Sequence, residues 1–344
     1  MFCVECGREG PTYEGLCGPC YLDRHRFAHI DEKVDLYRCG HCQEFCIDGE
    51  WTQIDSLEEA VSQAAVRALR VREDVSVQDI QVSIHPQDGS NLLVHLTLEM
   101  GFQDLEKTEE LETKVRVKGT SCPRCSRIKA DYYESILQIR SRDRSLGQEE
   151  KDEILDHIGS RLEEESRDNR DLFVSKLKEL HGGLDVYLSS SHMGKALSRE
   201  LAAMYGGQLK ESSTLVGQKE GKEVYRITFL VRLPAYRPGD IISHGARMYQ
   251  VGGVGAKSTR LVDLVTHEAS RVENTDLLDV MVRGHGSDID EAVVVSESEG
   301  EMQLLHPTSY RMVEVRKPPG YRGEGDTVRV FTREGEVFLL PNRG

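Results

Sequence analysis

The chain has 344 residues, with 44 Lys and Arg against 59 Asp and Glu, so its formal net charge is −15. At roughly 150 residues per domain, this length predicts two or three domains. A hydrophobic content of 38% excludes wholesale disorder, and no apolar run approaches the ~20 residues of a membrane helix. The N-terminus has neither the basic nor the apolar segment of a signal peptide. We therefore expect a soluble, cytoplasmic protein without membrane contacts.

The acidity argues against a protein that coats nucleic acid, DNA included, with its whole surface. A local basic footprint remains compatible with it, because residues 111–144 contain nine Lys and Arg against four Asp and Glu. The strongly acidic residues 148–171 follow directly, and we interpret them as a solvated helix face. The overall acidity is also compatible with a salt-rich cytoplasm.

Eight of the nine cysteines form four Cys-x-x-Cys pairs. Two thiolates three positions apart can bind one ion, and a second such pair completes the tetrahedral sulfur shell that zinc prefers. Eight ligands predict two structural zinc ions per chain. The simplest partition combines Cys3, Cys6, Cys17 and Cys20 in one site and Cys39, Cys42, Cys122 and Cys125 in the other. Interleaved pairing of the four motifs remains open at this point.

Other uses of these cysteines fit less well. A disulfide framework needs an oxidising compartment, a redox motif normally occurs once rather than four times, and iron–sulfur clusters usually show tighter cysteine runs. We interpret Cys46 as a spare thiol. Four thiolates close each coordination shell, so the sites are structural rather than catalytic.

The pattern divides the chain into three parts. Residues 1–145 form the zinc-binding domain, with an α+β insertion at about 51–118 that contains a helix from residue 56 and strands at 80–84, 92–98 and 114–118. Residues 146–232 form a helix plus a β-α-β-β domain. Residues 233–344 form paired small β-barrels of SH3-like or OB-like type, because short strands recur between turn residues. The fold class is therefore multidomain α+β.

Within these parts the pattern predicts individual elements. Residues 131–140 read as a strand, and residues 147–180 as one or two helices ending at Gly182 and Gly183. A strand at 184–188 precedes a helix at 191–205, with Ser191 as its expected cap and Gly206 as its stop. Two strands, 209–216 and 223–233, complete this domain.

Three stretches of sequence together resemble one family. They are the four cysteine motifs with a long gap before the last, the run Tyr132-Tyr133-Glu134-Ser135-Ile136 after it, and Leu233-Pro234 followed by Arg237-Pro238-Gly239-Asp240. The chain is identified by them as an archaeal member of the nonsense-mediated-decay-three family, the large-subunit export adaptors. The resemblance covers nearly the whole chain.

The resemblance implies a function. Family members are adaptors, not enzymes, that bind the large ribosomal subunit on its intersubunit face near the tRNA sites. It implies as partners rRNA, the exit-site stalk protein and the factor that blocks subunit joining, with a role in late subunit maturation or in preventing premature joining. The C-terminal part resembles the barrels of the hypusine-containing translation factor. We expect the free protein to be a monomer.

Contact with RNA requires that basic side chains gather on one surface of this acidic protein. The candidates flank the fourth cysteine motif or lie on the central helix and the barrel loops. They are Lys114, Arg116, Lys118, Arg124, Arg127, Lys129, Lys195, Arg199, Arg237, Lys257 and Arg260. Nearby Tyr132, Tyr133 and Tyr236 could stack on bases, and packing in the core is the alternative role for them.

The competing function is an acidic zinc scaffold that binds a protein partner without touching rRNA. Enzymatic activity is a minority interpretation, because no nucleophile, metal-helix or acid/base constellation stands out from the charged background. The glycine-rich residues 252–258 lack the spacing of a phosphate-binding loop.

Overall fold

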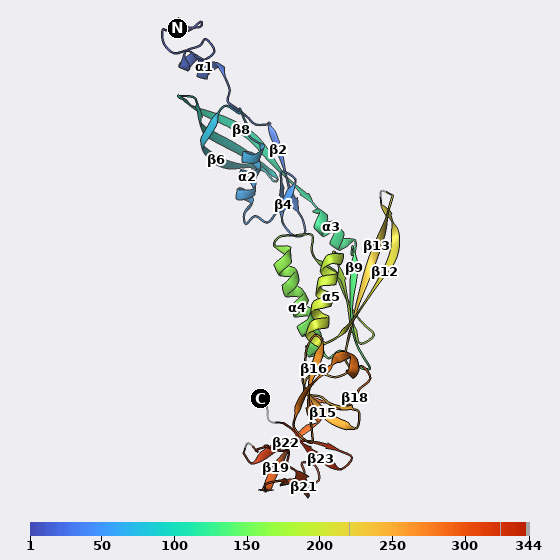
Figure 1. Cartoon of the computed structure of the whole chain (residues 1–344). Coiled ribbons are helices and arrows are strands. Elements are labelled where there is room, and N and C mark those ends of the chain that lie inside the picture. The colour runs from blue at the N-terminus through green and yellow to red at the C-terminus, as the bar shows by residue number, and fades with distance from the viewer. Residues whose placement is uncertain (220, 324, 342–344) are drawn as a thin grey trace. The chain divides into compact units, whose positions relative to one another are not determined.

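The computed structural model describes residues 1–219, 221–323 and 325–341 (Figure 1). The chain divides into two compact units, Met1–Arg127 and Ile128–Gly344. Both units mix helices with a majority of strands, which confirms the predicted α+β class. No helix in the described ranges has both the length and the apolar character that crossing a bilayer demands.

The first unit is built on a six-stranded sheet with the order β4-β3-β2-β8-β7-β6, accompanied by a small β1–β5 pair. Its elements in chain order are α1 (Gly18–Arg24), β1 (Ala28–His29), β2 (Lys33–Cys39), β3 (Phe45–Ile47), β4 (Glu50–Thr52), α2 (Leu57–Ala68), β5 (Arg70–Val71), β6 (Ser76–Asp88), β7 (Asn91–Phe102), β8 (Leu105–Thr120) and α3 (Pro123–Lys129). The three strands predicted for the insertion are present and longer than expected.

Helix α2 packs on this sheet through its buried Ala60, Val61, Ala64 and Ala65. The helix starts where the sequence predicts, because the Ser56 hydroxyl accepts a hydrogen bond from the Glu59 backbone N–H at 3.0 Å. Alternate residues of β7 are buried beneath it, as the period of a half-exposed strand requires.

The second unit begins with a five-stranded sheet of order β10-β11-β9-β13-β12. Its elements are β9 (Ser135–Ser141), α4 (Gln148–Ser166), β10 (Val174–Leu180), β11 (Gly183–Leu188), α5 (Ser191–Tyr205), β12 (Gln208–Lys219) and β13 (Lys222–Leu233). Helices α4 and α5 lie side by side (Figure 1) and share one hydrophobic core with one face of this sheet.

Three details of this sheet differ from the sequence-based expectation. Residues 174–180, expected to be helical, form strand β10 paired with β11, because an edge of the sheet offers them a ladder of backbone partners. Strand β9, which we grouped with the zinc domain, lies at the centre of this sheet between β11 and β13. The cap of α5 is Ser190 rather than Ser191, since its side chain accepts from Met193 N–H.

The rest of the second unit consists of two five-stranded sheets, ordered β17-β16-β15-β14-β18 and β21-β20-β19-β22-β23. Their strands are β14 (Ile241–His244), β15 (Arg247–Val254), β16 (Ser258–Asp263), β17 (Ala269–Glu273), β18 (Met281–Gly284), β19 (Ile289–Glu297), β20 (Glu301–Leu305), β21 (Met312–Arg316), β22 (Thr327–Arg333) and β23 (Glu336–Leu339). Short 3-10 turns at Asn274–Leu277 and Gly286–Asp288 complete them. The predicted barrel-like C-terminal region is confirmed.

Candidate metal centres and basic side chains

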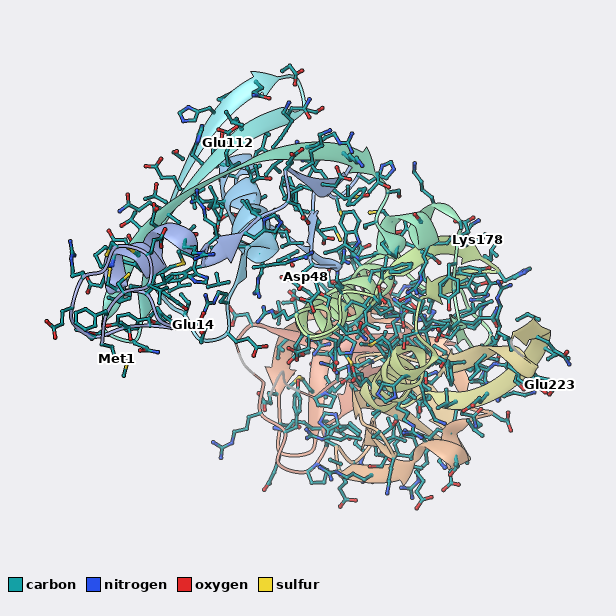
Figure 2. All side chains as sticks on the ribbon, turned by 90° about the horizontal axis from the view of Figure 1, so that it is seen from above. Met1, Glu14, Asp48, Glu112, Lys178 and Glu223 are labelled. Atoms are coloured by element: carbon teal, nitrogen blue, oxygen red, sulfur yellow. The ribbon has the colours of Figure 1, made fainter. Side chains whose placement is uncertain are left out.

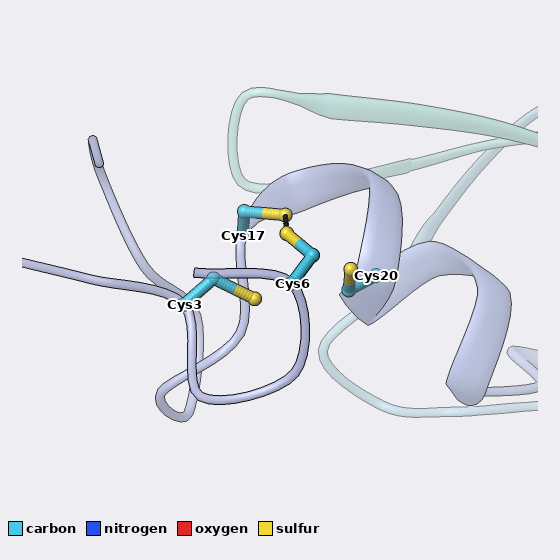
Figure 3. A group of neighbouring side chains, drawn as sticks. All are labelled: Cys3, Cys6, Cys17 and Cys20. Carbon is cyan, nitrogen blue, oxygen red and sulfur yellow. Dashed lines mark hydrogen bonds between the residues drawn. The ribbon is translucent and has the colours of Figure 1, made fainter. Parts of the chain in front are cut away.

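The first cysteine cluster joins Cys3, Cys6, Cys17 and Cys20, whose Sγ atoms all lie within 4.8 Å of one another. Figure 3 shows the four sulfur atoms pointing into a common space. The Cys6 and Cys17 sulfurs are 3.6 Å apart. Among the described residues, only one other group of ligand-type side chains is equally close, and it consists of the second four cysteines.

Two different backbone structures present these thiols. The Cys3–Cys6 pair lies in a tight turn in which Gly7 N–H donates to the Cys3 carbonyl, and Gly7 has φ +70°, a conformation natural to glycine. The Cys17–Cys20 pair instead lies at the start of α1, with proline in its first turn. Free N–H groups at a helix start favour a thiolate there.

The second cluster joins Cys39, Cys42, Cys122 and Cys125, again with all Sγ atoms within 4.8 Å. It repeats the design of the first cluster: the Cys39–Cys42 turn ends at Gln43 with φ +65°, and Cys122–Cys125 leads into α3. The sulfurs of Cys42 and Cys122 are 3.7 Å apart.

Parallel pairing of β2 with β8 brings the two halves of the second cluster together. Cys39 is opposite Thr120 in this register, and Gly40 N–H donates to the Thr120 carbonyl at 2.9 Å. The Cys122 N–H then donates to the Cys39 sulfur at 3.4 Å. The simplest partition of the four motifs, which the sequence left open, is thereby confirmed.

The geometry of both clusters fits zinc. A tetrahedral shell with Zn–S bonds of about 2.3 Å puts neighbouring sulfurs about 3.8 Å apart, close to the 3.6 and 3.7 Å found here. A disulfide would need about 2.05 Å, and all nine cysteines are free. Each cluster could therefore hold one zinc ion, two per chain, and zinc would supply folding energy by cross-linking these small segments.

Electrostatics within the clusters agree with thiolate ligands. Backbone hydrogen bonds from Cys17 and then Cys6 lower the pKa of Cys3 to about 6. Burial acts to raise the pKa of Cys39, but N–H groups of Cys122, Cys42 and His41 lower it to about 5. In the same clusters the pKa values of the crowded partners are raised, Cys20 by hydrogen bonding to Cys17 and Cys42 chiefly by burial. A cation bound at the centre of a cluster would stabilise all four of its cysteines as thiolates, including those whose pKa is raised here.

Two of the predicted basic residues of the first unit are already bound to a carboxylate. Arg116 and Lys118 on β8 both bind Asp35 on β2, at 2.9 and 2.5 Å, and lower its pKa, Lys118 most strongly. Lys114 is half-buried and Arg127 is exposed. The Nε atom of Arg124 is buried without a hydrogen-bond partner in the described part of the chain.

The candidates of the second unit lie on several elements rather than in one cluster. Arg237 binds the buried Glu150 at 3.1 Å and Lys195 binds Glu211 at 3.5 Å. The remaining candidates are exposed: Lys129, Arg199, Lys257 and Arg260. Tyr236 is only 2% exposed and its hydroxyl contacts Thr259, so of the two roles considered for it, core packing is the one it has.

The sequence did not reveal the side chains that surround the clusters. Trp51 on β4 packs against the second cluster. The buried carboxylate of Glu109 accepts hydrogen bonds from Phe27 and Ala28 N–H, just after the first cluster. An isolated tryptophan and a glutamate within an alternating strand carry no distinctive spacing, so only the fold exposes their roles. Cys46 lies on β3, outside both clusters.

Comparison of the sequence with known protein families covers both the cysteine clusters and the sheet of the second unit. A family model described as NMD3, N-terminal domain, matches residues 3–130, and one described as NMD3, second domain, matches residues 132–233. Among solved structures, eukaryotic translation initiation factor 5A from Methanococcus jannaschii is similar over 31% of this chain and 89% of its own length, with 12% identity and a TM-score of 0.21. No curated protein matches the sequence.

The fold and the two cysteine clusters define a multidomain, strand-rich α+β protein with two four-cysteine sites that could each hold a zinc ion. The matches to family models identify the family of this protein. The chain belongs to the NMD3 family, whose two domain models together account for residues 3–130 and 132–233. The family predicted from the cysteine motifs and the tyrosine-rich segment is confirmed, and a ribosome-related adaptor is the class of protein consistent with it.

Proposed function

We propose that this protein is a non-enzymatic, zinc-containing adaptor that binds the large ribosomal subunit on its intersubunit face near the tRNA sites. It acts there in late subunit maturation or in preventing premature subunit joining. The observation that carries the proposal is the coincidence of NMD3 family membership over residues 3–233 with two complete four-cysteine clusters inside that range.

The proposal includes partners and location. The large subunit contributes rRNA and the exit-site stalk protein, and the factor that blocks subunit joining is a further partner. The free protein is a cytoplasmic monomer of archaeal type that binds neither DNA nor membranes. Turns held by zinc suit such a role, because a metal-held turn presents a surface of fixed shape without a large core.

Exposed basic side chains are the proposed rRNA contacts. Lys257 directly precedes β16 and Arg260 lies within it; both are exposed, and neither forms an ion pair with any described residue. Arg116, Lys118 and Arg237 are bound to carboxylates and would have to exchange those partners for phosphate. We therefore expect the exposed pair to contribute more to RNA affinity than the paired residues.

A second function is favoured by those same ion pairs. If Arg116, Lys118 and Arg237 keep their internal carboxylates, the protein is an acidic zinc scaffold that binds a protein partner without direct contact with rRNA. Salt distinguishes the two functions, because phosphate contacts release counterions and weaken steeply with salt.

The test is sucrose-gradient co-sedimentation of the purified chain with separated ribosomal subunits across a salt series, with zinc determined on the same sample. We expect binding to large subunits only, lost as salt rises, with two zinc ions per chain.

Lys257→Gln combined with Arg260→Gln should weaken binding and flatten its salt dependence. The control, Arg311→Gln with Arg316→Gln, removes two exposed charges elsewhere on the barrels and should change neither. No association at any salt by a zinc-loaded chain would contradict direct subunit binding.

A further inference from the structure

One face of the second unit's sheet is left open. Helices α4 and α5 pack on the opposite face, where Leu137, Ile139, Phe229 and Val231 are buried. Directly paired residues of neighbouring strands share a face, so the intervening residues form rows on the side away from the helices. One row is Lys176, Tyr187, Ile136, Thr228 and Ser212, and the next is Lys178, Asp185, Gln138, Leu230 and Lys210.

Exposure along the central strand β9 confirms that this side faces solvent within the second unit. Leu137 and Ile139 are 0% exposed, whereas Ile136 and Gln138 between them are partly exposed. We call the rows, together with Arg140, Arg226 and Arg232 at their ends, the open face. Lys178, which Figure 2 labels, is one of its exposed residues.

Charge on the open face is opposite to that of the whole chain. Asp185 is the only acid in the described rows, and Arg140 neutralises it at 2.5 Å. Lys176 binds Asp131 of the preceding loop at 3.1 Å. Four cations then remain without an ion pair to any described residue: Lys178, Lys210, Arg226 and Arg232.

The helical side of the same sheet concentrates negative charge. Helix α4 begins with Glu149 and Glu150 and ends with the run Glu163-Glu164-Glu165. The unpaired cations of the open face and the acidic run of α4 therefore lie on opposite sides of this sheet. An acidic protein that approaches a polyanion needs such a separation.

Aromatic rings stand among the unpaired cations. The Arg226 guanidinium lies 4.1 Å from the centre of the Tyr133 ring and donates to the Tyr133 hydroxyl at 3.1 Å. The Tyr133 ring meets Tyr187 edge to face, with centres 4.9 Å apart, and Lys178 lies 5.7 Å from the Tyr187 ring. These contacts hold planar groups in place before any ligand arrives.

We propose that the open face is a binding platform for single-stranded RNA. Unpaired bases stack on tyrosine rings and guanidinium planes while lysine and arginine contact the backbone. Hydroxyls of Ser212 and Thr228 stand in the first row, and Thr214 is paired with Arg226. An A-form duplex hides its bases and cannot use the rings, and an acidic peptide needs the cations alone. The combination on this face therefore favours unpaired RNA.

The biological setting of this inference rests on the proposed ribosome binding, but its test does not. The probe is a short fluorescein-labelled oligouridylate, titrated with the full-length zinc-loaded chain across a salt series. Arg226→Gln with Arg232→Gln should weaken binding and lower the slope of log affinity against log salt by about 1.4, since each single-strand phosphate contact contributes about 0.7. Tyr187→Leu should weaken binding about fivefold or more through lost stacking.

Controls separate this effect from charge and folding. Arg311→Gln with Arg316→Gln removes the same charge from the barrels and should bind like wild type. Circular dichroism checks folding, and Lys178→Gln, at an exposed position on the edge strand β10, is a second variant that should also weaken binding. Equal binding by wild type and the open-face variants overturns the inference, as does poly-glutamate or duplex RNA competing as well as the single strand.

Parallel co-sedimentation distinguishes this inference from the proposed function. A wild-type chain that binds large subunits but not the oligouridylate contradicts the platform and leaves the adaptor proposal standing. A chain that binds the oligouridylate through the open face but not the subunit supports the platform and contradicts the adaptor proposal.

Discussion

At the residue scale, two buried glutamates show how this acidic protein uses carboxylates as internal connectors. Glu109 has a fully buried side chain whose oxygens accept N–H groups of Phe27 and Ala28 at 3.1 and 3.2 Å, and Lys107 binds it at 2.7 Å. Burial acts to raise the pKa of Glu109, but the hydrogen bonds from Lys107 and from the two N–H groups outweigh it, so the pKa is lowered. The carboxylate thereby ties the segment after the first zinc cluster to strand β8.

Replacing this carboxylate by an amide should be costly. Glu109→Gln keeps the shape but leaves Lys107 with a buried, unpaired charge, and breaking such a pair costs about 3 kcal/mol. Trp51, the only tryptophan, lies in the first unit, so its fluorescence during urea unfolding measures this unit alone. Glu110→Gln, on the exposed side of the same strand, is the matched control. Equal unfolding midpoints for the two variants would refute the role of Glu109.

Glu150 plays the corresponding part in the second unit and makes its stability depend on pH. Arg144 binds both its oxygens, at 2.7 and 2.9 Å, and Arg237 adds a third contact. Despite burial, these arginines lower the pKa of Glu150. The folded-state pKa of Glu150 therefore lies below the unfolded value of about 4.3. Its ionised carboxylate stabilises the folded protein above that pH, and this stabilisation is lost as the pH falls through the folded-state pKa.

The pH dependence can be measured by hydrogen exchange in peptides of α4. At neutral pH, Glu150→Gln should reduce protection there, while Glu149→Gln, its exposed neighbour, should not. The difference between Glu150→Gln and wild type should shrink as pH falls below about 4. A difference that stays constant down to acid pH would show that the charge of Glu150 is not what stabilises this helix.

At the scale of elements, the sequence predicts what is local and misses what depends on strand order. The helix at 57–68 follows from its cap and spacing, the helix at 191–205 from its spacing and its glycine stop, and the cysteine clusters from the spacing of their motifs. The apolar residues of 174–180 recur at every third position, which favours a helix, and only the pairing with β11, through a register shift between Val174 and Lys176, makes them a strand. The open-face cations are likewise scattered over four strands, and no linear pattern unites Lys178 with Arg226.

The start of α5 offers a sharp test at this scale, because two adjacent serines compete for the cap. The Ser190 hydroxyl accepts Met193 N–H at 3.3 Å, so Ser190→Ala should lower the free energy of unfolding of the second unit by about 1 kcal/mol. Ser191→Ala, one residue into the helix, should be nearly neutral. Urea titration followed by far-ultraviolet circular dichroism compares the two, and a larger loss from Ser191→Ala would restore the sequence-based assignment.

At the scale of the whole molecule, both zinc clusters lie in the unit Met1–Arg127, whereas Ile128–Gly344 has its own hydrophobic cores and no cysteine. The cysteine spacing could predict the number of sites, but not that a parallel strand pair closes the second one over a gap of 79 residues. That closure couples the metal to the entire first sheet, since β2 and β8 are its central strands.

Metal removal should therefore act on one unit only. A chelator strong enough to take zinc from four thiolates should unfold residues 1–127, because these sites contribute folding energy directly, and should leave the sheet and barrels of residues 128–344 intact. Limited proteolysis of the chelated protein, read by mass spectrometry, should yield a stable fragment beginning near residue 128, while Trp51 emission shifts to the red.

Cys46→Ser, which lies outside both clusters, should not change zinc content or the fragment pattern, whereas Cys39→Ser should reduce zinc to about one per chain. Loss of the C-terminal fragment at the same rate as the N-terminal unit would mean that zinc stabilises the molecule as a whole.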